Sequence, residues 1–182
     1  MTDKQQSARV SQDASGEAHG ESPEQMAAMI AQRPIHGFRR MLGYRTTVWK
    51  ERYSEVVLTI DERHDNSHGI VHGGVYAAML DAAFGGAVAY CGVPGRTRLA
   101  VTITLQTTFL ASAKRGLLTA SGRVVGVEGR VATCAGEVRL DDGTVCATGQ
   151  ASFMYLHGSE LTDGVPAALR GQKKAEPQPR GQ

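Results

Sequence analysis

The apolar and polar positions of this chain first show the pattern of paired strands. In the segment 54–63, the apolar residues Val56, Leu58 and Ile60 occupy every second position. This period of two is typical of a strand that buries one face. Together with the preceding segment 44–53, it predicts a β-hairpin near the start of the folded body.

A different pattern follows, because the run from Val75 to Val93 is apolar almost throughout. The run is nearly long enough to span a bilayer, but Asp81 lies in its middle and its composition favours Ala and Gly. An acid at that depth is costly in a membrane. We therefore expect a long helix buried inside the protein, and no membrane partner.

Four more strands are predicted after this helix. Their segments are 98–110, where β-branched residues dominate, then 116–126, 130–140 and 144–156, the last following a hairpin signal at Asp142-Gly143. The order of two strands, one helix and four strands with short connections predicts an α+β fold, with a six-stranded antiparallel sheet around one central helix. One helix cannot cover both faces of such a sheet, so we expect a homo-oligomer.

Composition sets the limits of the folded region and of its partners. Residues 1–22 and 158–182 are polar and predict disordered extensions around a folded domain at 23–157. The formal net charge is +2 without a concentrated basic block, which does not favour nucleic-acid binding. The start lacks the apolar stretch of a secretory signal. We expect a cytoplasmic protein.

The cysteines do not form a recognisable framework. Cys91, Cys134 and Cys146 are an odd, widely spaced set without a CxxC pair. We interpret them as small buried side chains in a reducing compartment, and expect neither a disulfide nor a zinc site.

The chemistry is concentrated in the segment NSHGIVHGGVYAAMLDAAFGGAV. Gly73 and Gly74 stand at the predicted helix start, where backbone N–H groups are unpaired and the helix dipole favours negative charge. The Gly73 N–H is our candidate oxyanion donor. Asp81 is an acid in an apolar helix, a costly placement unless the carboxylate is paired or used. Taken singly, each feature also has a structural interpretation, such as a turn at Asn66 or an Arg partner for Asp81.

This Asn-x-x-Gly-x-x-His-Gly-Gly signature, with an Asp eight residues beyond its first paired glycine, resembles hotdog-fold thioesterases of the PaaI-like and 4-hydroxybenzoyl-CoA types. The resemblance extends over residues 43–154. It implies a sheet wrapped around the helix, subunits joined edge to edge, and dimers that commonly pair into tetramers. It also implies hydrolysis of an acyl-CoA substrate without metal or cofactor.

The resemblance also implies roles for individual residues. Asp81 is expected to be the general base for water or the nucleophile that forms a mixed anhydride, and both routes stay open. Asn66 is expected to position the thioester or the water. Thr102 corresponds to a Ser or Thr that orients the water in some relatives, although a strand Thr is equally a good β-former. Strand alternation groups Thr102 with Thr104 and Gln106.

The predicted substrate-binding residues are His72, Gly74, Lys114, Arg115 and Arg130. The three cations lie beside predicted strand ends and are candidates for contacts to the CoA phosphates. Each of them taken singly is also a normal solvated turn charge. His72 is a candidate acid or a residue that supports the loop.

Spacing predicts where the site is assembled. Gly73 and Asp81 are about 12 Å apart along one helix, so a carbonyl and an attacking water fit poorly between them. We therefore expect a site shared by two-fold related chains. Two other functions stay open, an enoyl-thioester hydratase and a non-catalytic acyl-CoA binding module. The acyl group, the choice of CoA or carrier-protein thioester, and the choice of dimer or tetramer are also open.

Overall fold

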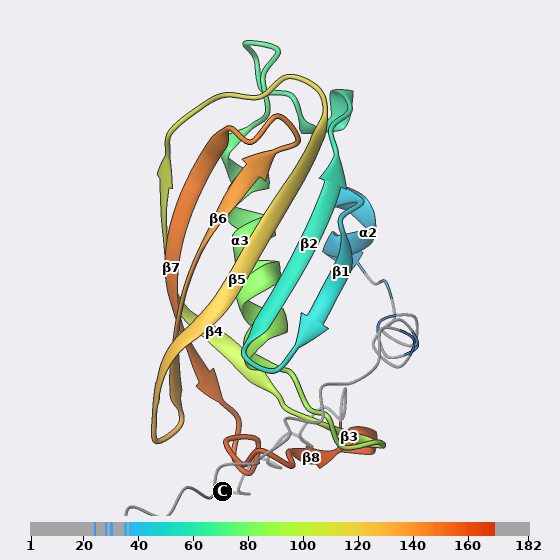
Figure 1. Ribbon diagram of the computed structural model, residues 1–182, viewed down its shortest axis with the longest axis vertical. Coiled ribbons are helices and arrows are strands. Elements are labelled where there is room, and N and C mark those ends of the chain that lie inside the picture. Colours follow the sequence, from blue (N-terminus) through green and yellow to red (C-terminus); the bar gives the residue numbers. More distant parts are fainter. Residues whose placement is uncertain (1–23, 25–27, 29, 31–34, 36, 170–182) are drawn as a thin grey trace, which may run out of the picture.

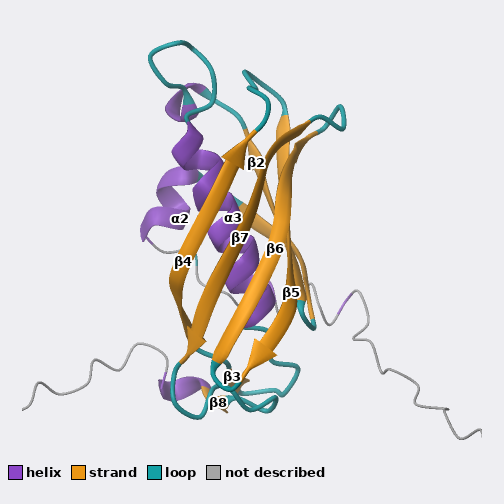
Figure 2. Cartoon of the chain, turned by 90° about the vertical axis from the view of Figure 1, so that its left-hand side faces the viewer, coloured by secondary structure: helices purple, strands orange, loops and turns teal. Residues whose placement is uncertain are grey.

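The body of the protein is a curved antiparallel sheet wrapped around one helix (Figures 1 and 2). The computed structural model describes residues 24, 28, 30, 35 and 37–169. The sheet order is β1-β2-β5-β6-β7-β4. The bounds are β1 Arg45–Lys50, β2 Tyr53–Thr59, α3 Gly73–Val88, β4 Ala100–Phe109, β5 Leu117–Glu128, β6 Val131–Leu140 and β7 Val145–Tyr155. The predicted α+β architecture, with six strands and one long helix, is confirmed.

Short elements complete the described chain. They are α2 Gly37–Leu42, η1 Glu62–His64, β3 Arg96–Thr97, β8 Val165–Pro166 and η2 Ala167–Leu169. Because β8 pairs with β3 and Ser159 is fully buried, the prediction of a disordered tail from residue 158 is wrong for residues 158–169. The polar composition of this segment concealed backbone contacts that hold it, such as the bond from Arg98 Nε to the Ser159 carbonyl. The predicted extension 1–22 and residues 170–182 lie outside the described residues.

The sheet approaches α3 closely because a row of glycines crosses it. Gly122, Gly136 and Gly149 pair in register on three neighbouring strands. A Cβ on Gly136 would lie 2.0 Å from the Ser121 carbonyl oxygen and 2.8 Å from the Phe84 ring. Side chains at these positions would therefore push the helix off the sheet, and the glycines fix the depth at which α3 lies.

The helix α3 is buried on one side only. Phe84, Leu80 and Met79 are fully buried against the sheet. By contrast Asp81 and its small neighbours Ala77, Ala78, Ala82 and Gly85 are only partly buried. The open side of α3 is thus lined by small residues around one acid. Among the described residues, no helix has the length and apolar character needed to cross a membrane.

The strand β4 forms one edge of the sheet and is unusually apolar for an exposed strand. Of the described strands it pairs only with β7, and Val101 and Ile103 are about half exposed, at 51% and 48%. An uncovered apolar edge strand offers unpaired backbone groups to another chain.

The three cysteines are free and buried, as the sequence predicts. Burial raises the pKa of the Cys134 thiol to about 12. The thiol therefore stays protonated and unreactive at neutral pH.

Candidate active site

The loop before α3 is closed by Asn66. Its side-chain oxygen accepts a hydrogen bond from the His68 N–H at 2.8 Å, and its own N–H donates to the Ile70 carbonyl at 2.8 Å. Gly69, at φ +67°, takes the left-handed conformation that the turn requires. The side-chain oxygen of Asn66 is thus used in shaping the loop, while the residue also lines the cavity next to Gly73.

The first turn of α3 keeps one backbone donor unused. His72 is the N-cap, and its Nδ1 accepts a hydrogen bond from the Gly74 N–H at 2.9 Å. The Gly73 N–H has no acceptor among the described residues. His72 and Gly74 therefore satisfy each other, and Gly73 presents a free N–H at the positive end of a helix.

A cavity of about 370 Å³ lies beside this donor. Its lining is mostly apolar and consists of Asn66, Ile70, Val71, Gly73, Tyr76, Phe109, Leu110, Ala111 and Ser112. The Phe109 ring covers Gly73 so closely that a Cβ on Gly73 would lie 3.1 Å from the ring tip. An apolar group placed here would lie directly beside the Gly73 N–H.

Among the described residues, Asp81 has one hydrogen-bond partner and no paired cation. The Thr102 hydroxyl donates to Asp81 Oδ1 at 2.7 Å. Within the described part of the chain no Lys, Arg or His forms an ion pair with Asp81. Asp81 therefore has no Arg partner within the described residues, and its carboxylate keeps lone pairs for other partners.

Thr102 reaches Asp81 because β4 contains a β-bulge. Thr102 pairs with Phe153 but Thr104 pairs with Ser152, so Ile103 is an extra residue. Phe153 packs against Gly85 on α3, and cross-strand partners share a face. The predicted grouping of Thr102 with Thr104 and Gln106 is thus wrong, because the bulge turns Thr102 to the helix side.

The structure brings the predicted residues into two separate groups within one chain. Asn66 and Gly73 share the cavity at the start of α3, whereas Asp81 and Thr102 meet two turns further along and line neither described cavity. The two groups therefore do not share either described cavity within a protomer.

The predicted cations are also divided. Arg115 is paired with Asp65 at 3.1 Å, and this hydrogen bond raises the pKa of Arg115. Lys114 is exposed beside it. Arg130 follows the other end of the 12-residue strand β5, roughly 40 Å away. The three predicted cations of one protomer therefore cannot all contact the same ligand.

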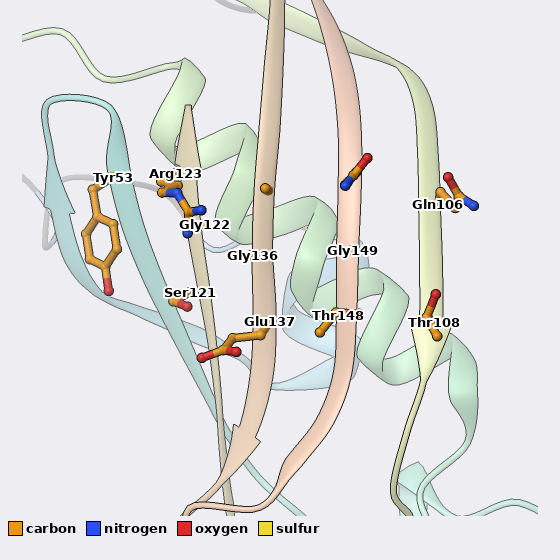
Figure 3. A pocket seen from close by; sticks show the side chains of 12 residues that line it. Tyr53, Gln106, Thr108, Ser121, Gly122, Arg123, Gly136, Glu137, Thr148 and Gly149 are labelled. Carbon is orange, nitrogen blue, oxygen red and sulfur yellow. The ribbon is translucent and has the colours of Figure 1, made fainter. Parts of the chain in front are cut away.

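The larger described cavity, about 420 Å³, is a polar trough on the outer face of the sheet (Figure 3). Tyr53, Gln106, Arg123 and Glu137 line it, on the opposite side of the strands from α3. Burial, with help from Glu55, raises the pKa of Tyr53 to about 12. The trough is separate from Gly73 and Asp81.

Sequence reasoning missed Phe109 and His64. Phe109 is an aromatic residue that ends a β-branched strand, and that position was a usable signal. His64, which the structure buries, gave no signal because it stands among polar loop residues. No group of three or more His, Cys, Asp or Glu side chains in the described ranges is arranged to hold a metal ion.

Comparisons with known proteins agree on the architecture. The model of the thioesterase superfamily matches residues 68–147, which contain Gly73, Asp81 and Thr102. No curated protein matches the chain.

Solved structures share the fold at low sequence identity. The conserved protein PA5202 of Pseudomonas aeruginosa is 24% identical with a TM-score of 0.62, over 75% of this chain and all of that one. The E. coli PaaI protein of the phenylacetic acid degradation operon is 21% identical with a TM-score of 0.62, over 74% and 93%. Thioesterase HI1161 of Haemophilus influenzae is 18% identical with a TM-score of 0.60, over 75% and 91%. Residues 68–147 are thus similar to the thioesterase superfamily, and the solved structures show that the chain has the hotdog fold.

Proposed function

We propose that the protein hydrolyses acyl-CoA thioesters in a site built from two copies of the chain. The Gly73 N–H of one protomer binds the thioester carbonyl oxygen, and Asp81 of the other protomer acts on the carbonyl carbon from the opposite side. The thioesterase superfamily match supports this reaction class.

The observation that carries the proposal is the state of Asp81. Its carboxylate is held by the Thr102 hydroxyl at 2.7 Å and lies on the open side of α3, with no paired cation among the described residues. A structural acid is normally satisfied by cations or several donors. This one is oriented by a single donor and is otherwise available for chemistry.

The edge strand supports a shared site. Antiparallel pairing of β4 with its copy over the full length of the strand would set Thr102 opposite Thr107 of the partner subunit, two residues from the partner subunit's Phe109. Since Phe109 covers Gly73 and Thr102 binds Asp81, this pairing would bring the two groups together across the two-fold axis. It would also cover the apolar edge.

The same pairing supports CoA as the thiol half of the substrate. Lys114 follows Phe109 by five residues, whereas Arg130 lies at the Thr102 end of the sheet. Antiparallel association reverses one chain, so Arg130 of one protomer and Lys114 of the other would lie at the same end. Two cations there suit the phosphates of CoA.

The reaction balances with these groups alone. In the general-base route, Asp81 takes a proton from water while the water oxygen bonds to the carbonyl carbon, and the negative charge on the carbonyl oxygen is stabilised by the Gly73 N–H. The C–S bond then breaks, and the thiolate leaves and is protonated. In the nucleophilic route, the Asp81 oxygen bonds to the carbonyl carbon and the C–S bond breaks, so that the thiolate leaves and is protonated. Water then cleaves the resulting mixed anhydride to the free acid and the Asp81 carboxylate.

The test is a hydrolysis screen over aryl-, short-, medium- and long-acyl-CoA thioesters, following release of the free thiol. Asp81→Asn is the matched control, because it keeps the size and the Thr102 contact. We expect wild-type turnover that falls about 10²- to 10⁴-fold in this variant. Binding without turnover by the wild type would favour the binding module, and hydration of an enoyl thioester would favour the hydratase.

A further inference from the structure

We propose that His64 is a positioning residue that holds the Gly73 N–H in place by tying α2 to the start of α3. This inference rests on the proposed oxyanion role of Gly73. His64 touches no reacting group in the proposed reaction and acts through its neighbours.

Both nitrogens of the His64 ring are used inside the protein. The side chain is 1% exposed. Its Nδ1 accepts a hydrogen bond from the Asp61 N–H at 3.0 Å, so the proton is on Nε2, which lies 2.8 Å from the Leu42 carbonyl oxygen and donates to it. A buried imidazole with two fixed partners has one orientation only.

The backbone of His64 continues this connection to the site. Its carbonyl oxygen accepts a hydrogen bond from the His72 N–H at 2.7 Å. His72 in turn caps α3 through the Gly74 N–H, and this leaves the Gly73 N–H unpaired. Displacement of His64 would therefore move the residue that sets the direction of the Gly73 donor.

The other end of the connection is the last turn of α2. Its final carbonyls have no partners within the helix. His64 binds the carbonyl of Leu42, and Arg63 Nη1 donates to that of Met41 at 3.4 Å. The segment 61–64 thus satisfies the end of one helix while it supports the start of the next.

Asp61 completes the arrangement as the capping residue of η1. Its carboxylate accepts hydrogen bonds from the Arg63 side chain and from the Arg63 N–H. The Arg63 hydrogen bonds hold the pKa of Asp61 at about 2, so the cap remains charged at neutral pH. The capping box that includes His64 is therefore fixed from both sides.

The experiment compares His64→Leu, which removes both ring hydrogen bonds, with His64→Gln, which is long enough to donate to the Leu42 carbonyl. The turnover rate of an accepted thioester should fall about 10- to 100-fold in His64→Leu with KM changed less than about twofold. His64→Gln should recover part of the loss. His68→Leu is the matched control, because that side chain is exposed in the same loop, and its turnover should equal the wild type.

A second measurement does not depend on activity. Hydrogen exchange of the His72 amide should be at least about tenfold faster in His64→Leu than in the wild type, and unchanged in His68→Leu. Thermal unfolding of each variant identifies any variant that fails to fold. If His64→Leu does not fold, the turnover and the His72 exchange of His64→Gln are compared with the wild type instead.

Two results would overturn the inference. One is unchanged turnover and unchanged His72 exchange in His64→Leu, and the other is a rise in KM with turnover preserved. A wild type that hydrolyses no thioester would defeat the proposed function instead, while faster His72 exchange in His64→Leu would still support the link between His64 and the start of α3.

Discussion

The two ends of the proposed chemistry lie on one helix but in opposite surroundings. Gly73 is enclosed by its own chain, with His72 capping the next N–H and the Phe109 ring above it. Asp81 is bound by one hydroxyl from the edge strand and faces outward. The surroundings of the Gly73 N–H are complete within one chain, whereas those of Asp81 remain open. This difference is expected if a second copy of the chain completes the site.

After Asp81→Asn, the largest effect on turnover is expected from Gly73→Pro, which removes the Gly73 N–H. Proline is well suited to the first helical position, and His72 already has the extended backbone, φ −64° and ψ 136°, that a following proline prefers. The substitution thus removes the N–H with little cost to the helix, and turnover should fall about 10²- to 10³-fold. Gly73→Ala, which keeps the N–H and only displaces the Phe109 ring, should lose much less.

Mixing two inactive variants tests whether the site is shared between two chains. Unfolding Gly73→Pro and Asp81→Asn chains together and refolding them should yield heterodimers with one intact site and one doubly altered site. Random pairing then restores about a quarter of wild-type activity. Recovery near zero, with heterodimers present, would place both groups in one protomer's site and contradict the sharing.

A smaller effect is expected from the hydroxyl that orients the acid. Thr102→Val keeps the shape of the side chain and removes the donor, so turnover should fall about tenfold, the value of one hydrogen bond to a charged group. Thr102→Ser should stay within about threefold of wild type. Equal losses in both variants, measured beside unchanged melting temperatures, would mean that packing rather than the hydroxyl matters.

The position of both ends relative to the sheet depends on the depth of α3. Gly136→Ala places a methyl group 2.0 Å from a backbone oxygen, so the sheet or the helix must shift. We expect a loss of about 1–3 kcal/mol in the free energy of unfolding, measured in urea. Gly129→Ala is unsuitable as a control, because Gly129 has a φ of +54° and an alanine there would strain the backbone. Ala135→Ser, a small change on the outer face of the same strand, should be close to neutral.

The smallest expected effect is a pH dependence of stability that comes from Asp61, in the segment that supports the start of α3 near Gly73. Hydrogen bonds from Arg63 lower the pKa of Asp61 from 3.8 to about 2, so the charged form is favoured in the folded state. Its contribution to stability is present above about pH 4 and is lost as the pH falls toward 2. Urea midpoints of wild type and Asp61→Asn should differ at pH 7 and converge near pH 2. A constant difference would contradict this role.

Much of the fold was predictable because its signals are local. A strand is predicted directly by the every-second-residue spacing of Val56, Leu58 and Ile60. The central helix is predicted by the long apolar run that contains one acid. The residues 158–169 were not predictable, since the backbone carbonyls of this polar segment accept hydrogen bonds from the Arg96 and Arg98 side chains, and such contacts leave no hydrophobic pattern.

The residues of the candidate site could be proposed from the sequence, but their arrangement could not. Asn66, Gly73 and Asp81 follow from their motif, whereas the pairing of Thr102 with Asp81 depends on a bulge that no alternation rule contains. His64 was missed for a related reason. Its proposed role depends on a contact to the carbonyl of Leu42, 22 residues away in the sequence.

The extra residue at Ile103 has a consequence for reading related sequences. An alignment that runs through this strand without a gap, against a relative that lacks the insertion, would be offset by one residue on the upstream side. It would then match Thr102 with a side chain that points away from the helix. Assignments of equivalent residues here should be made from superposed backbones, with counting restarted after position 103.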